Sequence, residues 1–557
     1  MQRTLALALI LFTALCTFGQ VPAPAQSTRG IDDVLSYISN AWSTLARSNQ
    51  DCKTFVDQRK DQAKAVIYFP ADQSLPPVAS DLEKRCNVDV EQLPKVITAP
   101  GQFDPSSVKP GVLFLPNPYV VPGGFFNEMY GWDSYFIIRG LLRAGKIDMA
   151  RGQVENFFFE IEHYGSILNA NRTYFLSRSQ PPFLSAMVMA VNDAQNEASK
   201  QNDRAWLAKA YPYIVRDWKM WTSAPHLAGN TGLSRYFDFG NGPSAEFTAA
   251  GDPYYAEMIT AVLSNNLQTD YFAKTADPNA LGYNLEVCVD TAKHACAKST
   301  RIVLTDDYYK GDRSMRESGF DVSSRFGPYS GHTHHYAPVC LNSLLYQTEK
   351  NLATIATILG KSDEAKEWNE RAQHRSELMN KYLWNAQKGM YFDYDFMAGK
   401  QSDYNYATTF YPLWVGQASP EQAKALIANV KTFEQPGGVV MSTYDTHLQW
   451  DFPYGWAPVN LIDIEGLRNY HDDADANRLS YKFLSMIVQN FRRDGTIREK
   501  YNMVSRSDEQ NVSVGYHVNV IGFGWTNGAF LSLLHELPPS EREALGANKP
   551  WNAALGE

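Results

Sequence analysis

The sequence predicts an all-α fold, built as a closed ring of helical hairpins with long loops that carry the chemistry. Apolar residues recur at helical spacing along most of the chain. No extended alternation of apolar and polar residues indicates a large sheet, and residues 439–444 predict at most one short strand. Long segments rich in glycine, proline and aromatic residues separate the helical stretches, and loops of such length are usually functional.

The helical segments justify this prediction in chain order. The first spans residues 32–46, where Val34, Ile38 and Trp42 fall on one helical face. The same pattern recurs at 136–161, 186–221, 343–383 and 474–492. Ser419-Pro420 is typical of a helix start, with a capping serine before proline at the first helical position. Each amphipathic helix must bury one face against another, which a ring of paired helices achieves.

The sequence also predicts how the chain is divided into a signal peptide and a catalytic domain. Residues 1–25 read as a signal peptide, with Arg3, an apolar run at 5–14 and a small-residue cleavage site at Ala23-Pro24-Ala25. The expected location is therefore periplasmic or secreted. No low-complexity linker divides residues 26–557, so we expect a single catalytic domain with an N-terminal extension over about 26–110.

The net charge of −9 argues against two classes of partner. An acidic chain without a basic patch is a poor candidate for binding nucleic acid or an anionic membrane. We expect a neutral small-molecule partner, no cofactor and a monomeric protein.

The cysteines favour disulfides rather than a metal centre. Outside the signal peptide, the shortest pairings join Cys52 to Cys86 and Cys288 to Cys296, which leaves Cys340 free. The histidines of the run GHTHHY at 331–336 lie beside Cys340 and could supply metal ligands. Such a run more often lines a loop and the cysteine spacing does not fit a zinc ribbon, so we expect no metal.

Two distant segments share an unusual pattern of aromatic, acidic, proline and glycine residues. Residues 122–135 read PGGFFNEMYGWDSY and residues 449–458 read QWDFPYGWAP. Alone, each is compatible with a buried aromatic cluster. Together they resemble the two signature segments of the trehalases, glycoside hydrolase family 37. The resemblance extends from DCKTF at 51–55 to GFGWTNG at 522–528, and it implies an (α/α)6 toroid that hydrolyses an α-glucoside.

Two further segments supply candidates for the two carboxyl groups that glycoside hydrolysis needs. RESGFDVSSR at 316–325 resembles the family's RESGWDFSSR, which implies that Asp321 is the general acid. REKYN at 498–502 resembles its EKYD, which implies that Glu499 is the general base. The alternatives are a helix-capping or arginine-paired Asp321 and a surface pair of Glu499 with Lys500.

The resemblance also implies a substrate-binding set. NANRTY at 169–174 and RSQPP at 178–182 match a loop whose asparagine, arginine and glutamine contact the sugar. The expected binding residues are Phe126, Trp132, Asp133, Asn169, Arg178, Ser179, Gln180, Glu246, Gly319, Trp450 and Tyr516.

Several positions depart from the family pattern. Phe125 and Ser244 stand where family arginines are expected, and Tyr516 stands in place of a glutamate. Phe320 replaces a tryptophan and Cys340 an aspartate. The catalytic pair is kept while charged substrate contacts are lost.

The sequence therefore predicts an exported, inverting α-glucoside hydrolase, with α,α-trehalose as the first expected substrate. Two alternatives stay open at this point: a related α-glucosidase that acts on another α-glucoside, and a degenerate sugar-binding protein with little turnover.

Overall fold

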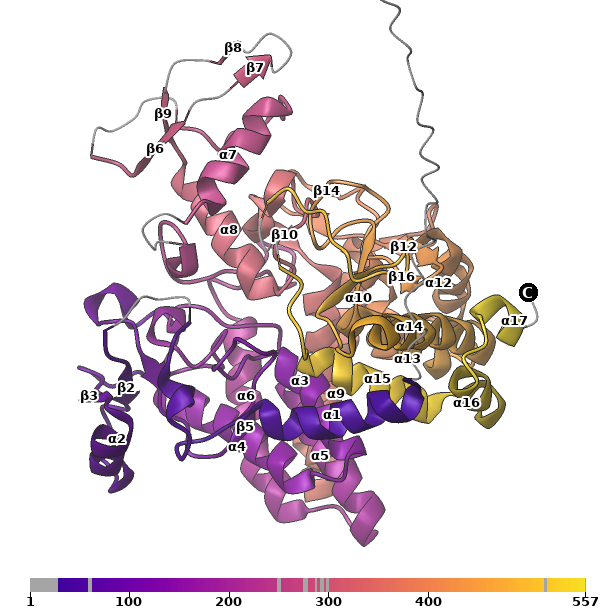
Figure 1. The fold of residues 1–557 in the computed structure, drawn as a ribbon, viewed down its shortest axis with the longest axis horizontal. Helices are drawn as coiled ribbons and strands as arrows, with labels where there is room; N and C mark the ends of the chain where they lie inside the picture. Colours follow the sequence, from indigo (N-terminus) through magenta and orange to yellow (C-terminus); the bar gives the residue numbers. More distant parts are fainter. Residues whose placement is uncertain are drawn as a thin grey trace, which may run out of the picture.

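The computed structural model describes residues 29–58, 63–247, 252–273, 279–285, 288–290, 295–296, 300–514 and 518–555. The expected signal peptide lies outside these ranges. The described chain is rich in helices, with only small sheets (Figure 1). Among the described residues, no helix combines the length and apolar character needed to cross a membrane.

Six helices pack side by side in a closed series. They are α3 (Asp133–Arg143), α5 (Leu184–Ser199), α9 (Val339–Leu359), α11 (Tyr411–Trp414), α13 (Ala457–Asn469) and α15 (Gly524–Glu536). Each contacts the next in this order, and α15 returns to contact α3. The contact between α3 and α15 depends on glycine, because a Cβ added to Gly528 would lie 2.0 Å from the carbonyl oxygen of Phe136.

A second set of helices lies around this series. It consists of α4 (Ile147–His163), α6 (Arg204–Trp221), α10 (Ser362–Tyr382), α12 (Pro420–Phe433), α14 (Asp473–Asp494) and α1 (Ile31–Thr44). Helices α4, α6, α10 and α14 pack on the preceding member of the closed series, and α1 packs on α14 and α15. One large hydrophobic core extends through both sets.

The long helical segments of the sequence are helical hairpins. The segment 136–161 divides into α3 and α4 near Gly145, and the segment 343–383 divides into α9 and α10 at Gly360. Both glycines have a positive φ, 70° and 81°, which ends one helix and reverses the chain. The predicted start at Ser419 is confirmed: its hydroxyl accepts a hydrogen bond from the Gln422 amide, 3.2 Å away.

The sheets are small, as the sequence predicts, but one of them is parallel. In the N-terminal region β2 (Val66–Phe69) pairs in parallel with β3 (Asp89–Gln92) and β4 (Val112–Leu113), beside α2 (Val78–Cys86). This sheet was not predicted from the sequence, because its strands are short and are buried on both faces only at β2 and β4. The strand expected at 439–444 shrinks to β16 (Gly438–Val439).

The remaining elements connect the helices. The other antiparallel pairings join β1 (Ala46–Arg47) to β5 (Tyr119–Val120), β6 (Gly282–Leu285) to β9 (Thr300–Val303), β7 (Cys288–Asp290) to β8 (Ala295–Cys296), β13 (Tyr394–Asp395) to both β10 (Tyr336–Ala337) and β14 (Lys400–Gln401), β11 (Trp384–Asn385) to β12 (Met390–Tyr391), β15 (Glu434–Gln435) to β16, and β17 (Tyr454–Trp456) to β18 (Lys500–Asn502). Helices α7 (Tyr254–Ser264) and α8 (Asp306–Ser318) flank β6–β9, and α16 (Pro539–Gly546) and α17 (Trp551–Leu555) follow α15 (Figure 1).

The cysteine predictions are partly confirmed. Cys52 and Cys86 form a disulfide, and Cys340 is free and buried. Cys340 lies 3.6 Å from the Tyr236 hydroxyl. Cys288 and Cys296 are directly opposed in the backbone register of β7 and β8. Their side chains lie outside the described residues, so their pairing stays a prediction.

Thiol mapping tests that pairing. We expect an alkylating reagent to label Cys340 in the unfolded, unreduced protein, and to leave Cys288 and Cys296 unlabelled, because directly opposed strand residues are close enough to bond. Cys52 and Cys86 serve as the internal control for protected thiols. Labelling of Cys288 and Cys296 before reduction would contradict the second disulfide.

Candidate active site

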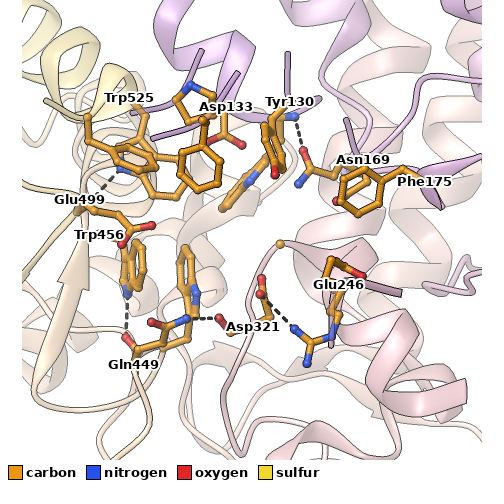
Figure 2. A pocket seen from close by; sticks show the side chains of 18 residues that line it. Tyr130, Asp133, Asn169, Phe175, Glu246, Asp321, Gln449, Trp456, Glu499 and Trp525 are labelled. Carbon is orange, nitrogen blue, oxygen red and sulfur yellow. Dashed lines mark hydrogen bonds and ion pairs between the residues drawn. The ribbon is translucent and has the colours of Figure 1, made fainter. Parts of the chain in front are cut away.

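Loops from distant parts of the chain meet around one cavity, which encloses about 610 Å³ of space and is partly open to solvent (Figure 2). Its lining combines aromatic rings with carboxyl, amide and guanidinium groups. The lining residues are Pro122, Phe126, Tyr130, Trp132, Asp133, Asn169, Phe175, Gln180, Glu246, Arg316, Gly319, Asp321, Gln449, Trp450, Trp456, Glu499, Phe523 and Trp525.

Trp132 sets the position of one wall, because it lies at the start of α3 and against the end of α8. Gly319 ends α8 with φ 78°, and a Cβ added there would lie 2.8 Å from the Trp132 ring. Both the backbone conformation and the close approach therefore require glycine. This contact brings the loop after α8, which carries Asp321, next to α3.

A cluster of tryptophans continues the wall at Trp132, whose ring centroid lies 5.9 Å from that of Trp450 and 5.7 Å from that of Trp525. Trp450 and Trp456 stack in parallel with ring centroids 3.8 Å apart, and Trp525 lies edge-on to both. The indole nitrogen of Trp525 donates to the carbonyl oxygen of Glu499 at 3.1 Å. The tryptophans therefore form an apolar surface and also fix the backbone at Glu499.

Asp321 follows α8 and faces the cavity (Figure 2). Its carboxylate oxygen Oδ2 lies 3.6 Å from Nη1 of Arg316, and its carbonyl oxygen accepts from the Gln449 amide. Burial raises the pKa of Asp321 to about 6, against the opposing positive charges of Arg316 and Arg178. At pH values near or below 6, a large fraction of Asp321 thus carries a proton.

Glu499 precedes β18, and its backbone amide donates to the Val520 carbonyl at 3.0 Å. Its side chain is 7% exposed, and Nζ of Lys500 lies 3.2 Å from its Oε2. Burial raises the pKa of Glu499, and Lys500 opposes this shift. Burial also raises the pKa of Asp133 well above its usual range, and the charges of Glu499 and Asp321 add to that shift. Asp133 is therefore the carboxyl group that the charges of the other two affect.

The amide side chains lie on the side of α3. The carbonyl Oε1 of Gln180 accepts from the Trp132 backbone at 2.9 Å, which leaves its amide N–H groups as the donors available to the cavity. Asn169 is held through its backbone, which donates to the Arg178 carbonyl at 2.8 Å and accepts from Gly131 at 3.2 Å. Its side chain also lines the cavity.

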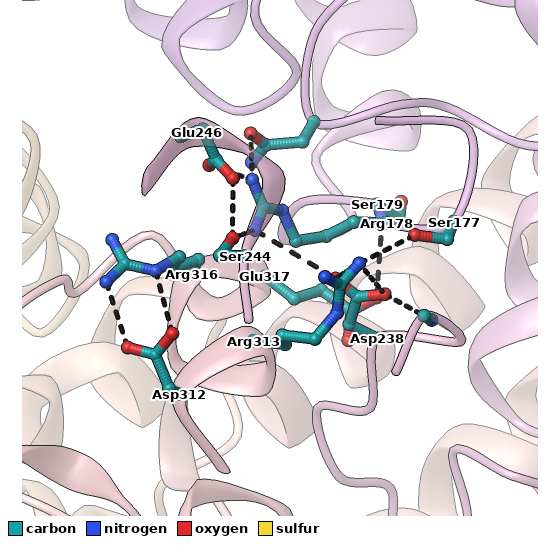
Figure 3. A network of polar contacts seen from close by, with 12 residues as sticks. Ser177, Arg178, Ser179, Asp238, Ser244, Glu246, Asp312, Arg313, Arg316 and Glu317 are labelled. Atoms are coloured by element: carbon teal, nitrogen blue, oxygen red, sulfur yellow. Dashed lines mark hydrogen bonds and ion pairs between the residues drawn. The ribbon is translucent and has the colours of Figure 1, made fainter. Parts of the chain in front are cut away.

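Arg178 is not among the residues that line the cavity, and it takes part in a buried network of polar contacts (Figure 3). Its guanidinium donates to Ser244 at 2.9 Å, to Asn169 at 3.4 Å and to Glu246. Burial opposes ionisation of Glu246, but Arg178 and Arg316 hold the pKa of this carboxyl below its usual range. The expected contact of Arg178 with a sugar stays a prediction. In the structure Arg178 bonds to Glu246 and Asn169, which do line the cavity.

Comparison with known proteins agrees with this arrangement. The family model described as Trehalase matches residues 32–538. The chain belongs to the trehalase family. It is 34% identical over 519 residues to the cytosolic neutral trehalase of Emericella nidulans, covering 83% of this chain and 65% of the relative. It is 34% identical over 521 residues to that of Saccharomyces cerevisiae, covering 85% and 66%. The chain thus spans about two-thirds of the length of these relatives.

A solved structure extends the comparison to the fold. Neutral trehalase Nth1 of Saccharomyces cerevisiae is 30% identical and superposes with a TM-score of 0.76, over 94% of this chain and 97% of that chain. The family assignment predicted from the signature segments is therefore confirmed, and with it membership of a glycoside hydrolase family.

The predicted location is wrong by the same comparison. These relatives are named cytosolic neutral trehalases, which contradicts a periplasmic or secreted protein. The prediction depended on an apolar run near the N-terminus, and this run lies outside both the described residues and the family match. A short apolar stretch without structural context was too weak a signal for export.

The structure brings most of the expected site residues of this trehalase-family chain to the cavity. Those that line it are Phe126, Trp132, Asp133, Asn169, Gln180, Glu246, Gly319, Asp321, Trp450 and Glu499. Ser179 is buried behind it, where its backbone amide donates to Glu317 at 3.3 Å, and Tyr516 lies outside the described residues.

Several lining residues were not selected from the sequence. They are Pro122, Tyr130, Phe175, Arg316, Gln449, Trp456, Phe523 and Trp525. Most of them belong to the same trehalase-like segments, so position within a motif was the available signal. Arg316 shows this best, because it begins the segment that contains Asp321.

The departures from the trehalase pattern have visible consequences. Ser244 is fully buried; it accepts from Arg178 and donates to Glu246 at 2.5 Å. Phe125 packs on Phe126 with ring centroids 4.1 Å apart and carries no charge. Arg316 therefore remains as the arginine that lines the described cavity.

The contact between α8 and α3 predicts the effect of a single methyl group. We expect Gly319→Ala to destabilise the protein by about 2–4 kcal/mol, from the left-handed backbone and from the clash with Trp132. Gly360→Ala is the matched control, because Gly360 has φ 81° and no atom within 4 Å of an added Cβ. It should cost about 1–2 kcal/mol. Equal losses of thermal stability in the two variants would contradict a packing role for Gly319.

Proposed function

We propose that this protein hydrolyses an α-glucoside with inversion at the anomeric carbon, and that α,α-trehalose is its first substrate. The observation that supports this most is the pairing of Asp321 with Glu499. The buried Glu499 and the half-buried Asp321, which are held by different loops and have raised pKa values, line one cavity (Figure 2). Glycoside hydrolysis needs such a pair of carboxyl groups around the scissile bond.

In the proposed reaction Asp321 is the general acid. With a pKa of about 6 it can hold a proton and donate it to the glycosidic oxygen as the bond from that oxygen to the anomeric carbon breaks. Arg316, 3.6 Å from Asp321, stabilises the carboxylate that remains. Glu499 is the general base: it takes a proton from a water molecule, whose oxygen bonds to the anomeric carbon from the other face.

The cavity lining supplies the proposed sugar contacts. Trp132 and Trp450 offer apolar faces for the C–H surface of a glucose ring, while Asn169 and Gln180 offer amide groups to its hydroxyls. Asp133 and Glu246 add carboxyl oxygens. A neutral sugar suits this mixture of rings and short polar groups.

The helices support the toroid that the sequence resemblance implies. Six helices contact one another in a closed series, and a second set packs outside them. We propose that these two sets are the inner and outer layers of an (α/α)6 toroid. Residues 26–557 would then form one catalytic domain with the N-terminal region attached.

A related α-glucosidase is the second candidate, and Phe125 and Ser244 favour it. Each stands where a charged sugar contact is expected in the family, and a charge-assisted hydrogen bond contributes roughly 1.5–3 kcal/mol. Weaker discrimination at the leaving-group side and a higher KM for trehalose would follow. A glucose-release assay over trehalose and other α-linked disaccharides separates this candidate from a trehalase and from a sugar-binding protein without turnover.

Removal of either proposed catalytic group tests the assignment. We expect Asp321→Asn and Glu499→Gln each to lower kcat for trehalose by about 10²- to 10⁴-fold, since each removes a proton-transfer step. Glu370→Gln, an exposed carboxylate on α10, is the control and should keep full activity. An active Asp321→Asn or Glu499→Gln protein with unchanged kcat would refute the role of that residue.

The pH dependence tests the two roles separately. Activity should fall as pH rises through about 6, because Asp321 loses the proton that it must donate. It should also fall at low pH, as Glu499 becomes protonated. Arg316→Met removes a charge that lowers the pKa of Asp321, so the high-pH limb should move to higher pH. Lys500→Met should instead move the low-pH limb upward, because Lys500 opposes the raised pKa of Glu499.

The assignment of acid and base would be contradicted if a variant shifted the other limb of the pH–activity profile from the one predicted for it. If Lys500→Met moved only the high-pH limb, Glu499 would have to be the acid. Profiles of kcat/KM report the free enzyme and are the measurement to use.

A further inference from the structure

A second cavity adjoins the first on the far side of Asp321. It is lined by Phe125, Glu246, Phe247, Asp252, Pro253, Tyr254, Glu257, Arg316, Asp321, Val322, Gln449, Val518 and Val520. Glu246, Arg316, Asp321 and Gln449 line both cavities. The proposed acid, Asp321, therefore lies where the two cavities meet. If the scissile bond of a substrate lies beside Asp321, the leaving group extends into the second cavity.

The walls of this second cavity are mainly apolar. Phe247 and Tyr254 pack with ring centroids 4.6 Å apart, and the Arg316 guanidinium lies 4.1 Å from the Phe247 ring centroid. The rings therefore cover one face of the charge. Phe125 contributes a further ring from the loop before α3.

The mouth of the cavity also exposes apolar surface. Val518 is 67% exposed, and the buried Val520 lies in the same wall. Such surface loses contact with water when an apolar group covers it, which favours binding of that group. Glu246, Glu257 and Gln449 place polar groups beside this apolar surface, so the cavity can also accept a hydroxylated leaving group such as glucose.

We propose that the second cavity binds the leaving group and prefers an apolar one, so that alkyl or aryl α-glucosides are better substrates than glucosides with a small leaving group. This inference rests on the proposed hydrolase function. It names the substrate class that the leaving-group side selects. The glucose half of the substrate stays in the first cavity.

A series of alkyl α-glucosides tests this preference. Methyl, butyl and hexyl α-glucoside have leaving alcohols of similar acidity, so differences in kcat/KM report contacts of the alkyl chain. We expect kcat/KM to rise about tenfold or more from methyl to hexyl, because the added methylenes are buried against Phe125, Phe247 and Val518. A flat series, with trehalose still hydrolysed, would overturn the inference and leave the proposed function intact.

Substitutions in the cavity wall test whether the second cavity causes the preference for a long alkyl chain. The double variant Phe125→Asn/Val518→Ser should reduce the hexyl-to-methyl ratio to about threefold or less, since the apolar surface is removed. Met397→Ser is the control, because Met397 is also 67% exposed but lies outside the cavity. An unchanged ratio in the double variant would overturn the assignment of the cavity. Absence of turnover for trehalose and for α-glucosyl fluoride would instead refute the proposed function itself.

A second feature, a histidine cluster at the start of α8, carries a separate inference. Asp307, His332 and His335 each place one ligand atom within 4.8 Å of the other two. Asp307 lies in the first turn of α8, and the histidines lie on or beside the short 3-10 helix Thr333–His335. Cys340, which the sequence analysis grouped with these histidines, lies instead against Tyr236 and Arg325.

Further ligands surround this cluster. His334 Nε2 lies 3.0 Å from Asp307, and His332 Nε2 lies 2.8 Å from Asp270. His334 is buried, and its Nδ1 has no hydrogen-bond partner among the described residues. Imidazole nitrogens together with carboxylate oxygens suit a divalent transition metal such as Zn²⁺ rather than Ca²⁺ or Mg²⁺.

We infer that Asp307, His332 and His335 form a structural site for a divalent transition metal, in contrast to the expectation of no metal. The ion would join the first turn of α8 to the segment of the histidines. Helix α8 also carries Arg316 and ends beside Asp321, so the ion would steady the acid side of the cavity. The site is separate from both cavities.

Metal binding to the full chain without a histidine tag tests this site. After treatment with EDTA and dialysis, we expect Zn²⁺ to bind at about one equivalent, by equilibrium dialysis, and to raise the melting temperature. His332→Ala/His335→Ala should abolish both effects. His447→Ala is the control, because that exposed histidine pairs only with Asp445 among the ion pairs of the described residues. Failure of the unaltered protein to bind Zn²⁺, or equal binding by the double variant, would overturn the inference.

Discussion

The acid side of the cavity depends on a buried network of ion pairs along α8 (Figure 3). Asp312 accepts two hydrogen bonds from Arg316 and two from tyrosine hydroxyls, and Arg313 pairs with Asp238 at 3.1 Å. Removing one partner from such a pair costs about 3–5 kcal/mol, because the other charge is left buried. The network therefore fixes Arg316, and through it the charge that faces Asp321. Without these ion pairs, the Arg316 guanidinium would not be held beside the Asp321 carboxylate.

The base side is held by different means. Glu499 is anchored by backbone hydrogen bonds to Val520 and Trp525, and a single ammonium group, that of Lys500, lies against its carboxylate. Stacked tryptophans supply the rest of this wall. One carboxyl group thus faces a buried arginine and the other faces mainly apolar surface. The two carboxyl groups therefore have different neighbours, while burial raises the pKa of both.

Much of the fold and of the candidate site followed from sequence patterns, because motifs and helical periods are local. The helical segments, the cap at Ser419 and most of the segments that line the cavity were predicted, but the chain reversals at Gly145 and Gly360 within those segments were not located. What could not be foreseen depends on contacts across the chain. The hydrogen bonds of Arg178 to Ser244 and Glu246 are an example, because these partners lie far along the sequence.

The same limit explains the other differences. Asp307 and the histidines at 332 and 335 meet only because α8 packs on the following 3-10 helix, so no spacing rule revealed their cluster. The parallel sheet of the N-terminal region is built from short strands separated by a helix and loops. The second cavity combines residues from five separate stretches of the chain, and its apolar character cannot be recognised until the fold brings them together.

The most direct test of the central claim is the stereochemistry of the first products. If Asp321 and Glu499 act as acid and base on opposite faces of the bond, each molecule of α,α-trehalose yields one β-glucose and one α-glucose. Proton NMR in the first minutes of reaction, before the anomers interconvert, should show the two in equal amounts. Release of α-glucose alone would mean retention through a covalent intermediate, and would contradict the roles assigned to these two carboxyl groups.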